Sequence, residues 1–308
     1  MSGSGKIIVI TGPTATGKTG LGAQLAIETG GEVVSADSMQ VYKHMDIGTA
    51  KPTEQERLGV PHHMIDIVQP WEDYSVSSYV ADATLCIDDI RSRGKLPIIV
   101  GGTGLYIDSL LSGHGFRARG DSMLRKDLED EYEDSGGQAM LSKLREFDPD
   151  SADKLHANDK KRIVRAFEVY ATTGQTISEH DRYTKRLPPK YDAVKIGLTF
   201  SDRADLYKRI DTRVDTMLDK GLENEVRALL DMGLRPGCTA MQAIGYKEIA
   251  GAITGLYTLG QAVDKIKMES RRYAKRQLTW LRRDEKIKWF TWESEPDIGG
   301  CVRVIIAG

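Results

Sequence analysis

An apolar run leads into a glycine-rich loop in the stretch Ile7-Ile8-Val9-Ile10-Thr11-Gly12-Pro13-Thr14-Ala15-Thr16-Gly17-Lys18-Thr19. The apolar run is typical of a buried strand, and Leu21–Ile27, after the loop, has the periodicity of an amphipathic helix. The loop matches the phosphate-binding pattern G-x-x-x-x-G-K-[ST]. We therefore expect backbone N–H groups and the helix N-terminus to hold phosphate oxygens. Lys18 would neutralise the terminal phosphate, and the Thr19 hydroxyl would bind Mg²⁺.

The loop alone does not determine the reaction. Such a loop binds ATP or another di- or triphosphate in kinases and NTPases, and a diphosphate leaving group in some transferases. A purely structural glycine turn is the remaining alternative. The position of the loop between a strand and a helix argues against that alternative.

Strand and helix signals alternate over the first 112 residues. Further strand-like runs occur at Glu32–Ala36, Met64–Val68 and Pro97–Val100, with helical segments between them. This alternation is typical of a parallel sheet covered by helices. We therefore predict an α/β fold, a P-loop NTPase-like (nucleotide-kinase-like) parallel sheet flanked by helices.

The sequence pattern of the chain changes after residue 112. Residues 113–190 are highly charged and lack strand signals, and three segments in them have helical patterns: Asp121–Tyr132, Gln138–Phe147 and Asp159–Thr172. We predict that residues 113–190 form a mostly helical insertion domain. Residues 1–112 and 191–308 would then form the catalytic core.

The second part of that core begins with a strand. The run Ala193–Phe200 has strand character, helical patterns dominate residues 203–283, and Ile287–Trp292 is a last strand candidate. In the helical part, the face of Val263, Ile266, Tyr273, Ala274, Leu278 and Leu281 is predicted to point inward.

The bulk composition is that of an ordinary globular protein, with 40% hydrophobic and 29% charged residues over 308 positions. No apolar run reaches the 18 residues expected of a membrane span, and the N-terminus has neither a signal-peptide nor a transit-peptide pattern. The cysteines, Cys86, Cys238 and Cys301, are odd in number and far apart, which argues against a disulfide framework and against zinc. A cytoplasmic location is the expectation.

The net charge of −2 conceals an uneven distribution. The stretch from Lys265 to Arg283 carries a charge of +7, so the rest of the chain sums to −9. Like charges on one helix repel unless a polyanion neutralises them, so a phosphate-backbone surface is favoured over a merely solvated face. The eight bases of this basic helix are Lys265, Lys267, Arg271, Arg272, Lys275, Arg276, Arg282 and Arg283.

Polar residues follow two of the predicted strands. Asp37 ends the strand Glu32–Ala36 and should lie near the phosphate loop, because ligands gather at the carboxyl ends of parallel strands. A helix N-cap, an indirect Mg²⁺ contact and a catalytic base all remain open for this carboxylate. The turn Val100–Gly104 holds three glycines around Thr103, which would let the backbone approach a ligand. An ordinary strand–turn–helix connection also explains that turn.

Two further groups of bases have competing interpretations. Lys161, Arg162 and Arg165 lie beside an apolar stripe at helical spacing, so a solvated face over a core is the simplest interpretation. Arg209 and Arg213 are one helical turn apart. They could clamp a phosphate group or pair with neighbouring aspartates.

Four motifs together resemble those of the tRNA dimethylallyltransferase family, the bacterial-type tRNA isopentenyltransferases or IPP transferases. The similarity spans residues 6 to 292 and includes the pattern from Asn158 to Gly174. Departures are small: Thr16 stands where serine is common, and Lys43-His44 where Arg-Gly is frequent. The zinc-finger extension of eukaryotic relatives is absent. The four motifs are Gly12–Thr19, Ser35–Tyr42 running on through Met45–Pro52, Val100–Tyr106 and Gln242–Glu248.

The resemblance implies transfer of a dimethylallyl group from dimethylallyl diphosphate to the exocyclic N6 amine of the adenosine 3′-adjacent to the tRNA anticodon. The products would be N6-isopentenyladenosine and diphosphate. The loop with Lys18, and Mg²⁺ at Thr19, would hold the diphosphate, and Arg213, with Arg209, would stabilise its charge from the opposite side. Asp37 would take a proton from the amine, which Thr103 would orient.

The same resemblance implies that the anticodon stem-loop of tRNA is the partner, because a target base leaves its stack most cheaply in a loop. A monomer is expected, since one chain already supplies a basic surface of tRNA size. The residues expected to contact tRNA are Asp37, Ser38, Met39, Gln40 and Thr103; Lys161, Arg162, Ile163, Val164 and Arg165; and, from the basic helix, Arg271, Arg272, Lys275, Arg276, Arg282 and Arg283.

Three other functions compete with this one. A P-loop small-molecule kinase explains the first 40 residues but leaves the basic helix and the insertion without a task. A non-catalytic NTPase switch that binds nucleic acid would modify no RNA. A prenyltransferase acting on free AMP would need only one phosphate site and no large basic surface.

Overall fold

The computed structural model describes residues 6–113, 122–184 and 186–307. The chain divides into two compact units. The core unit comprises Met1–Gly113 and Lys190–Gly308, and the insertion unit comprises His114–Pro189. These limits lie one residue inside the insertion 113–190 expected from the sequence.

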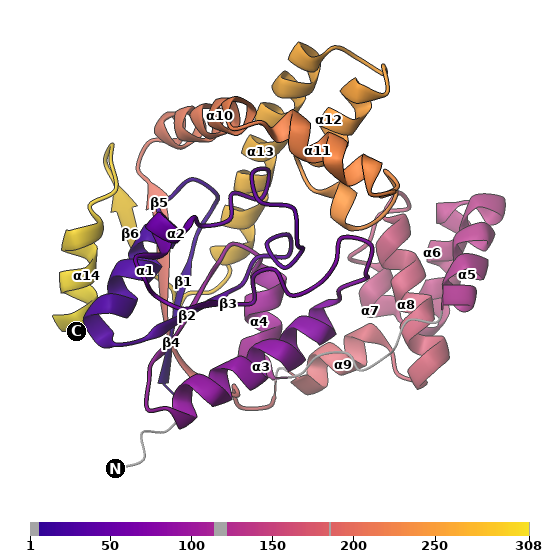
Figure 1. Ribbon diagram of the computed structural model, residues 1–308. Coiled ribbons are helices and arrows are strands. Elements are labelled where there is room, and N and C mark those ends of the chain that lie inside the picture. Colours follow the sequence, from indigo (N-terminus) through magenta and orange to yellow (C-terminus); the bar gives the residue numbers. More distant parts are fainter. Residues whose placement is uncertain (1–5, 114–121, 185, 308) are drawn as a thin grey trace. The chain divides into compact units, whose positions relative to one another are not determined.

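The core unit is built on a sheet of six strands in the order β3-β2-β4-β1-β5-β6 (Figure 1). Every pair is parallel, so the carboxyl ends of the strands meet at one edge. β1 lies inside the sheet, where Ile10 is paired with Val100 on one side and Ile196 on the other. The predicted α/β fold is confirmed. The strands are β1 Lys6–Thr11, β2 Glu32–Ser35, β3 His62–His63, β4 Pro97–Gly101, β5 Asp192–Phe200 and β6 Lys288–Trp292.

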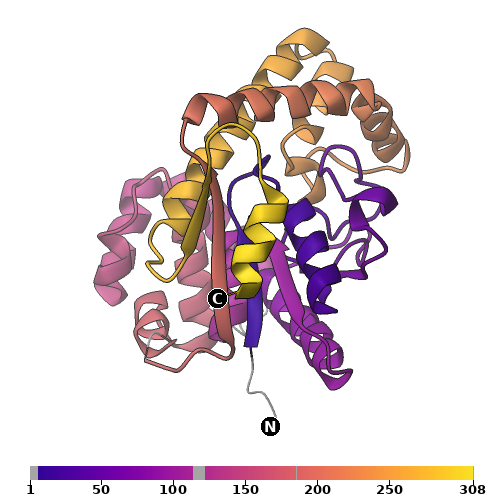
Figure 2. The same cartoon turned by 90° about the vertical axis from the view of Figure 1, so that its left-hand side faces the viewer.

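Helices cover both faces of this sheet, and the alternation along β1 explains why. Ile7 and Val9 pack with α3 (Val76–Ser92) and α4 (Gly104–Ser112) in one core. Ile10 packs in a second core with α1 (Lys18–Thr29) and α14 (Ile298–Ala307). Figure 2 shows α14 beside α1 in front of the strands. Successive side chains of one strand thus face different helix layers, as the period of two requires.

A third group of helices packs beyond the strand ends. It consists of α10 (Arg203–Asp219), α11 (Leu222–Asp231), α12 (Tyr246–Ile253) and α13 (Leu259–Leu281), with a 3-10 turn at Ala240–Gln242. Their core takes in loop residues that follow β2, including Val41 and Tyr42. In the sequence, the loop after β2 is followed by the short helix α2 (Glu54–Arg57).

Within its described residues, the insertion unit consists of helices joined by turns, without strands. Its core contains Met140, Leu144, Ile163 and Val164, all fully buried. Its helices are α5 Ser122–Ser135, α6 Gly137–Phe147, α7 Pro149–Ala152, α8 Lys160–Thr173 and α9 Ile177–Thr184.

One expectation about the elements was wrong, and one helix of the core was missed. The strand predicted at Met64–Val68 is absent, and β3 consists of His62–His63 alone. Met64 and Asp66 have φ values of 63° and 58°, and such left-handed backbone cannot continue a strand. The helix α14 was not predicted, although it supplies buried Cys301 and Val302 to the core. Among the described helices, none combines the length and the apolar character that a membrane span requires.

Candidate functional site

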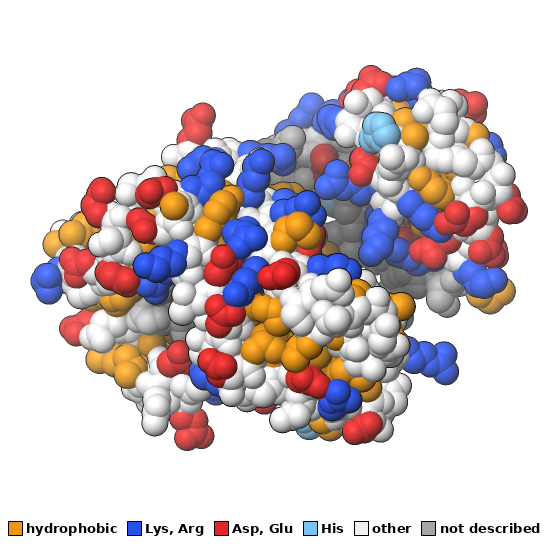
Figure 3. Space-filling view, turned by 90° about the horizontal axis from the view of Figure 1, so that it is seen from above, with side chains coloured by type: hydrophobic (Ala, Val, Ile, Leu, Met, Phe, Trp, Pro, Cys, Tyr) orange, Lys and Arg blue, Asp and Glu red, His pale blue; other side chains and the backbone are white. Residues whose placement is uncertain are grey.

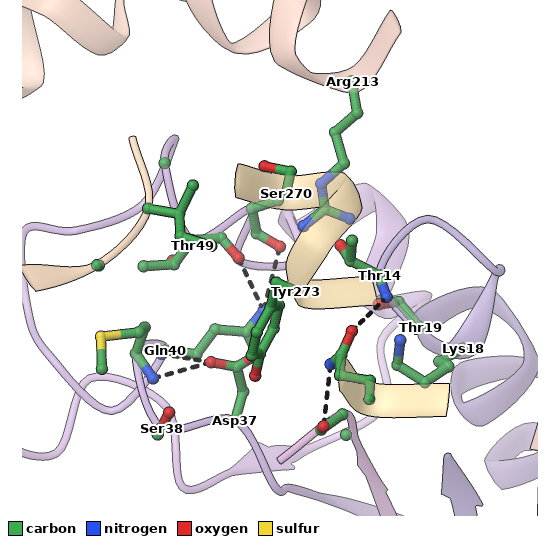
Figure 4. A pocket seen from close by; sticks show the side chains of 18 of the residues that line it. Thr14, Lys18, Thr19, Asp37, Ser38, Gln40, Thr49, Arg213, Ser270 and Tyr273 are labelled. Atoms are coloured by element: carbon green, nitrogen blue, oxygen red, sulfur yellow. Dashed lines mark hydrogen bonds between the residues drawn. The ribbon is translucent and has the colours of Figure 1, made fainter. Parts of the chain in front are cut away.

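A cavity of about 380 Å³ opens at the carboxyl edge of the sheet. Its walls come from the segments that follow β1, β2 and β4, and from the helices α10 and α13. Figure 4 shows Lys18, Thr19, Asp37 and Arg213 around this space, with Tyr273 between them. The parallel strands therefore bring the loop of Lys18 and Thr19 close to Asp37, and α10 adds Arg213 from far along the sequence.

The phosphate loop takes its shape from close backbone packing. Gly12 has a φ of 146°, and a Cβ there would overlap the carbonyl of Leu198 on β5. Gly17 has a φ of 87° and precedes the first turn of α1. The Oγ1 of the fully buried Thr16 donates to the carbonyl of Pro13 at 2.8 Å. The loop thus presents Thr14, Lys18 and Thr19 to the cavity, as the sequence motif predicts.

Positive charge is concentrated in the cavity. The Nζ of Lys18 donates to the carbonyl of Pro13 at 2.6 Å. Burial, together with the nearby Arg213, lowers the pKa of Lys18 to about 7, against a smaller opposing effect of Asp37. Burial also lowers the pKa of Arg213, opposed by Asp37 and Glu56. A bound polyanion would relieve both effects, so the cavity is suited to a diphosphate.

Asp37 lies two residues after the end of β2 and lines the cavity. Its Oδ1 accepts the backbone N–H groups of Met39 at 2.8 Å and Gln40 at 3.3 Å. These bonds fix the turn as a cap would, but no helix starts here. Its Oδ2 accepts no bond among the described residues, so one carboxylate oxygen is available to a substrate. Gln40 in turn donates from Nε2 to the carbonyls of Thr49 and Ala50.

Thr103 lies behind this turn. Its Oγ1 accepts the backbone N–H of Ser38 at 3.2 Å. It begins α4 without capping it. Burial, with a contribution from Asp37, raises the pKa of Tyr273 to about 12. Thr103 thus supports the turn that carries Asp37.

The glycines around Thr103 serve protein packing. A Cβ on Gly101 would overlap the backbone of Ala36, one on Gly102 the amide of Gln277, and one on Gly104 the ring of Trp280. Gly101 and Gly102 also line the cavity, so the expectation that these glycines let the backbone approach a ligand stays a prediction. They let α13 and the end of β2 lie against the turn.

Arg213 and Arg209 differ in their surroundings. Arg213 lines the main cavity and makes no ion pair among the described residues. Arg209 donates to the carbonyl of Ala15 at 3.2 Å and pairs with Glu295 at 2.6 Å. It lines a second cavity, of about 630 Å³, on the outer side of the loop. Lys18, Thr19 and Arg213 border both cavities.

The basic helix α13 is less uniformly charged than its sequence suggests. Arg271 pairs with Asp211, Lys267 with Asp215, and Arg272 with Glu269. Two of these acids lie on α10, where a single-helix pattern does not reveal them, and Glu269 lies on α13 itself, three residues before Arg272. Positive and negative side chains are also interspersed on the face drawn in Figure 3.

Four bases of α13 or its end stay exposed. The guanidinium of Arg276 lies 5.7 Å from the centroid of the Tyr273 ring, and that of Arg283 lies 5.6 Å from the centroid of the Trp280 ring. Lys275 and Arg282 are exposed as well. None of the four forms an ion pair within the described part of the chain. Arg276 also lines the main cavity. These bases form the outer basic face: Lys275, Arg276, Arg282 and Arg283.

The predicted tRNA contacts of the insertion unit divide by burial. Lys161 and Arg162 are exposed at the start of α8. Ile163 and Val164 are completely buried in the unit's core, so the expectation that their side chains contact tRNA is corrected. Arg165 pairs with the buried Glu168 at 2.9 Å.

Several site residues were missed. Ser270, Tyr273 and Gln277 reach the cavity from α13. Gln277, which is 7% exposed, occupies a position of the helix's inward face. A polar residue in an otherwise apolar stripe was the signal that could have identified it, because buried polar groups need partners.

The motif Gln242–Glu248 supports the cavity wall. The Tyr246 hydroxyl donates to Oε1 of Glu225 at 2.6 Å. Glu225 in turn accepts the backbone N–H groups of Asp46, Ile47 and Gly48 at 2.9, 2.8 and 3.1 Å. The motif thereby fixes the loop that brings Gly48, Thr49 and Ala50 to the cavity.

No cluster of three His, Cys, Asp or Glu side chains suited to a metal occurs among the described residues. The Thr19 hydroxyl lines the cavity and has no hydrogen-bond partner in the described ranges. Mg²⁺ commonly binds through one or two protein oxygens plus substrate phosphates. The donor set therefore fits a magnesium ion that arrives with a diphosphate.

Comparison with known proteins identifies relatives over nearly the whole chain. Residues 40–284 match the family model for IPP transferase, and residues 5–69 match the model for isopentenyl transferase. The chain is 50% identical to the tRNA dimethylallyltransferase of Carboxydothermus hydrogenoformans over 93% of this chain and 92% of that protein. It is 48% identical to that of Acetivibrio thermocellus over 92% and 90%.

Solved structures give the same picture. The tRNA isopentenylpyrophosphate transferase of Bacillus halodurans is similar with a TM-score of 0.73 and 42% identity, over 99% of this chain and 96% of that one. A eukaryotic dimethylallyltransferase acting on tRNA is similar with a TM-score of 0.84 and 33% identity, over 98% and 78%. The fold of this chain is thus the P-loop NTPase-like fold of these transferases.

Proposed function

The chain belongs to the IPP transferase family, and we propose that its cavity transfers a dimethylallyl group from dimethylallyl diphosphate to the N6 amine of the adenosine 3′-adjacent to the tRNA anticodon. It is an enzyme, a prenyl transferase of tRNA. The observation that carries the proposal is the convergence of a carboxylate, Asp37, with Lys18 and Arg213 in one cavity. The small-molecule kinase is set aside, because the family match extends to residue 284, far beyond the phosphate loop.

In the proposed reaction the adenine N6 attacks C1 of the dimethylallyl group. The bond between C1 and the diphosphate oxygen breaks, and the electron pair leaves with the diphosphate. The N6 proton passes to Oδ2 of Asp37, the oxygen that the turn leaves available. An adenine amine is a poor nucleophile, so a positioned base supplies about 10²–10⁴-fold of the rate.

The diphosphate would lie against Lys18 and Arg213, two cations whose pKa values are lowered chiefly by burial. Charge on the leaving group grows in the transition state, so these cations stabilise it more than the bound donor. Arg213 is the main clamp in this proposal, because Arg209 is already engaged with Glu295. Mg²⁺ held by Thr19 and the phosphate oxygens would supply further charge stabilisation.

The tRNA would approach with its anticodon stem-loop. Support for this comes from the outer basic face and from exposed Lys161 and Arg162 on the insertion unit. Ser38, Met39 and Gln40 line the cavity beside Asp37, so they are placed to contact the extruded base. Thr103 would orient the amine indirectly, through the Ser38 backbone. Because one chain carries both the cavity and the bases proposed to contact tRNA, we propose that the protein is a monomer. We also propose that it works in the cytoplasm.

Incubation with radiolabelled dimethylallyl diphosphate, Mg²⁺ and unmodified tRNA tests the proposal. The expected result is label in tRNA and an added prenyl mass on adenosine in the anticodon loop. A parallel reaction with γ-labelled ATP and small metabolites examines the kinase. Label in AMP rather than in tRNA, or phosphorylation of a metabolite without prenyl transfer, would contradict the proposed function.

A further inference from the structure

Gln277 of α13 joins two loops that meet at the cavity. Its Oε1 accepts the backbone N–H of Thr14 at 3.0 Å, and its Nε2 donates to the carbonyl of Gly102 at 2.9 Å. One buried amide therefore connects the phosphate loop after β1 to the turn after β4. Both functional groups of the side chain are satisfied, so its orientation is fixed.

The hydrogen bond from Thr14 to Gln277 also affects the position of Lys18, because the Pro13–Thr14 peptide links the two. The N–H of Thr14 and the C=O of Pro13 belong to the same peptide, which is trans, so they point in opposite directions. Because Gln277 holds the N–H, the C=O is directed to the other side of the loop. There it accepts the Nζ of Lys18 at 2.6 Å and the Oγ1 of Thr16 at 2.8 Å.

The packing around Gln277 leaves its amide little freedom. A Cβ on Gly102 would overlap its Nε2. Trp280, three residues further along α13, covers Gly104 in the same way and donates from Nε1 to Asp108 at 2.7 Å. The inner side of α13 is thus anchored on the turn Gly102–Gly104, while its exposed side carries Lys275.

We propose that Gln277 is a positioning residue for the leaving diphosphate, because it orients the Pro13–Thr14 peptide and thereby sets the place of the Lys18 ammonium. The inference rests on the proposed function, in which Lys18 acts on the diphosphate of a prenyl donor. It has a second consequence. In the proposed function the outer face of α13 contacts tRNA, while its inner face holds the phosphate loop that binds the prenyl donor. The binding sites of both substrates therefore depend on the same helix.

The variant Gln277→Met tests this role, since methionine has a similar length and cannot make either hydrogen bond. We expect kcat/KM for dimethylallyl diphosphate to fall about tenfold, the equivalent of one well-placed hydrogen bond. The dissociation constant for tRNA should stay unchanged, because the outer basic face is untouched. The matched control is Thr279→Ala, an exposed position of the same helix whose hydroxyl donates to the carbonyl of Lys275. It should alter neither quantity.

A second variant reaches the same amide from the opposite side. Gly102→Ala leaves Gln277 intact and displaces its Nε2, so it should reproduce the loss specific to the donor. This variant also keeps the test available if Gln277→Met does not fold.

The double variant Lys18→Ala with Gln277→Met shows whether Gln277 acts through Lys18. If it does, the loss caused by Gln277→Met disappears in the Lys18→Ala background, because interacting residues are not additive. A tenfold loss that persists there, an equal loss of tRNA affinity, or normal donor use in both single variants would overturn the inference. Failure of the unmodified enzyme to prenylate tRNA would instead count against the proposed function.

Discussion

The Nη1 of Arg271 lies 2.6 Å from Oδ1 and 2.7 Å from Oδ2 of Asp211, so this base of α13 is held by α10. The pair shows that bases on one helix can have different tasks. Those that face α10 hold two helices together, and they include Lys267, which pairs with Asp215 at 2.6 Å. Those of the outer basic face have no such partner among the described residues and are available to meet phosphates.

Neutralising Lys275, Arg276 and Arg283 together should weaken tRNA binding and reduce its dependence on salt. The slope of log Kd against log salt concentration should fall by about 0.7–0.9 for each phosphate that the protein no longer neutralises. Filter binding at several salt concentrations measures it. Arg271→Ala is the comparison, because removal of its pair with Asp211 should lower stability and leave the slope nearly unchanged. An unchanged slope in the triple variant would show that this face does not bind RNA.

Asp37→Asn should reduce turnover by about 10²–10⁴-fold, because the amide cannot accept the N6 proton. Its Oδ1 can still accept the backbone N–H groups of Met39 and Gln40, so the melting temperature should change little. Single-turnover prenyl transfer with saturating substrates measures the chemical step. Normal turnover would mean that Asp37 serves the turn alone.

Lys18→Ala should impair the use of dimethylallyl diphosphate and spare the affinity for tRNA. The ammonium is one of the cations that border both cavities, whereas the outer basic face lies on another element. Kinetics with varied donor, together with tRNA binding in its absence, separate the two effects. A proportionate loss of tRNA binding would contradict the assignment of Lys18 to the donor.

Tyr246→Phe should destabilise the protein by about 1 kcal/mol, the usual worth of one hydrogen bond. It should also raise the KM for substrate, because Glu225 then holds the Asp46–Gly48 loop less firmly. Urea denaturation and steady-state kinetics measure the two changes. Tyr183→Phe, at an exposed position of the insertion unit, is the control. A wild-type KM in Tyr246→Phe would limit the motif to a role in stability.

Glu32→Gln should lower stability in a way that depends on pH. Hydrogen bonds from Arg93, and also from Lys95 and His63, hold the pKa of this buried carboxyl well below its ordinary value of 4.5. A depressed carboxyl pKa adds stability above the unfolded-state pKa, and this contribution is lost as the pH falls through that value toward the folded-state pKa. The difference in unfolding free energy between wild type and variant should therefore be full at pH 7 and shrink below pH 4.5. A difference that does not vary with pH would refute this explanation.

The parts of the fold that the sequence predicts are those set by local pattern. These parts are the strand Ile7–Ile10, the glycine loop, and the change after residue 112 from alternating strand and helix patterns to helical patterns alone. Each depends on residues that are close together in the sequence. The strand prediction at Met64–Val68 was wrong because the apolar residues of this segment have a strand-like pattern, while positive φ values turn its backbone. Only the packing of this segment against residues 40 and 41 reveals that, through the bonds from Asp66 and Ile67.

The residues of the site likewise divide into those that a local sequence pattern predicts and those that depend on residues far away in the sequence. Lys18, Thr19 and Asp37 follow from strand ends, because all the strands are parallel. Gln277 could not be predicted in the same way, since its partners, Thr14 and Gly102, are 263 and 175 residues away. Asp211 and Asp215, which pair with bases of α13, come from α10, and so these pairs cannot be inferred from the pattern of one helix alone.

The position of β5 has a consequence for synthesis of the protein. β1 pairs on one side with β4, but on the other with β5, which begins only at Asp192. A nascent chain must therefore emerge past the whole insertion before the second edge of β1 is covered. The insertion's contacts are local, so it can fold while the core is still unfinished. A product that terminates near Gly113 would expose the edge of an apolar strand, and such edges recruit other chains into aggregates.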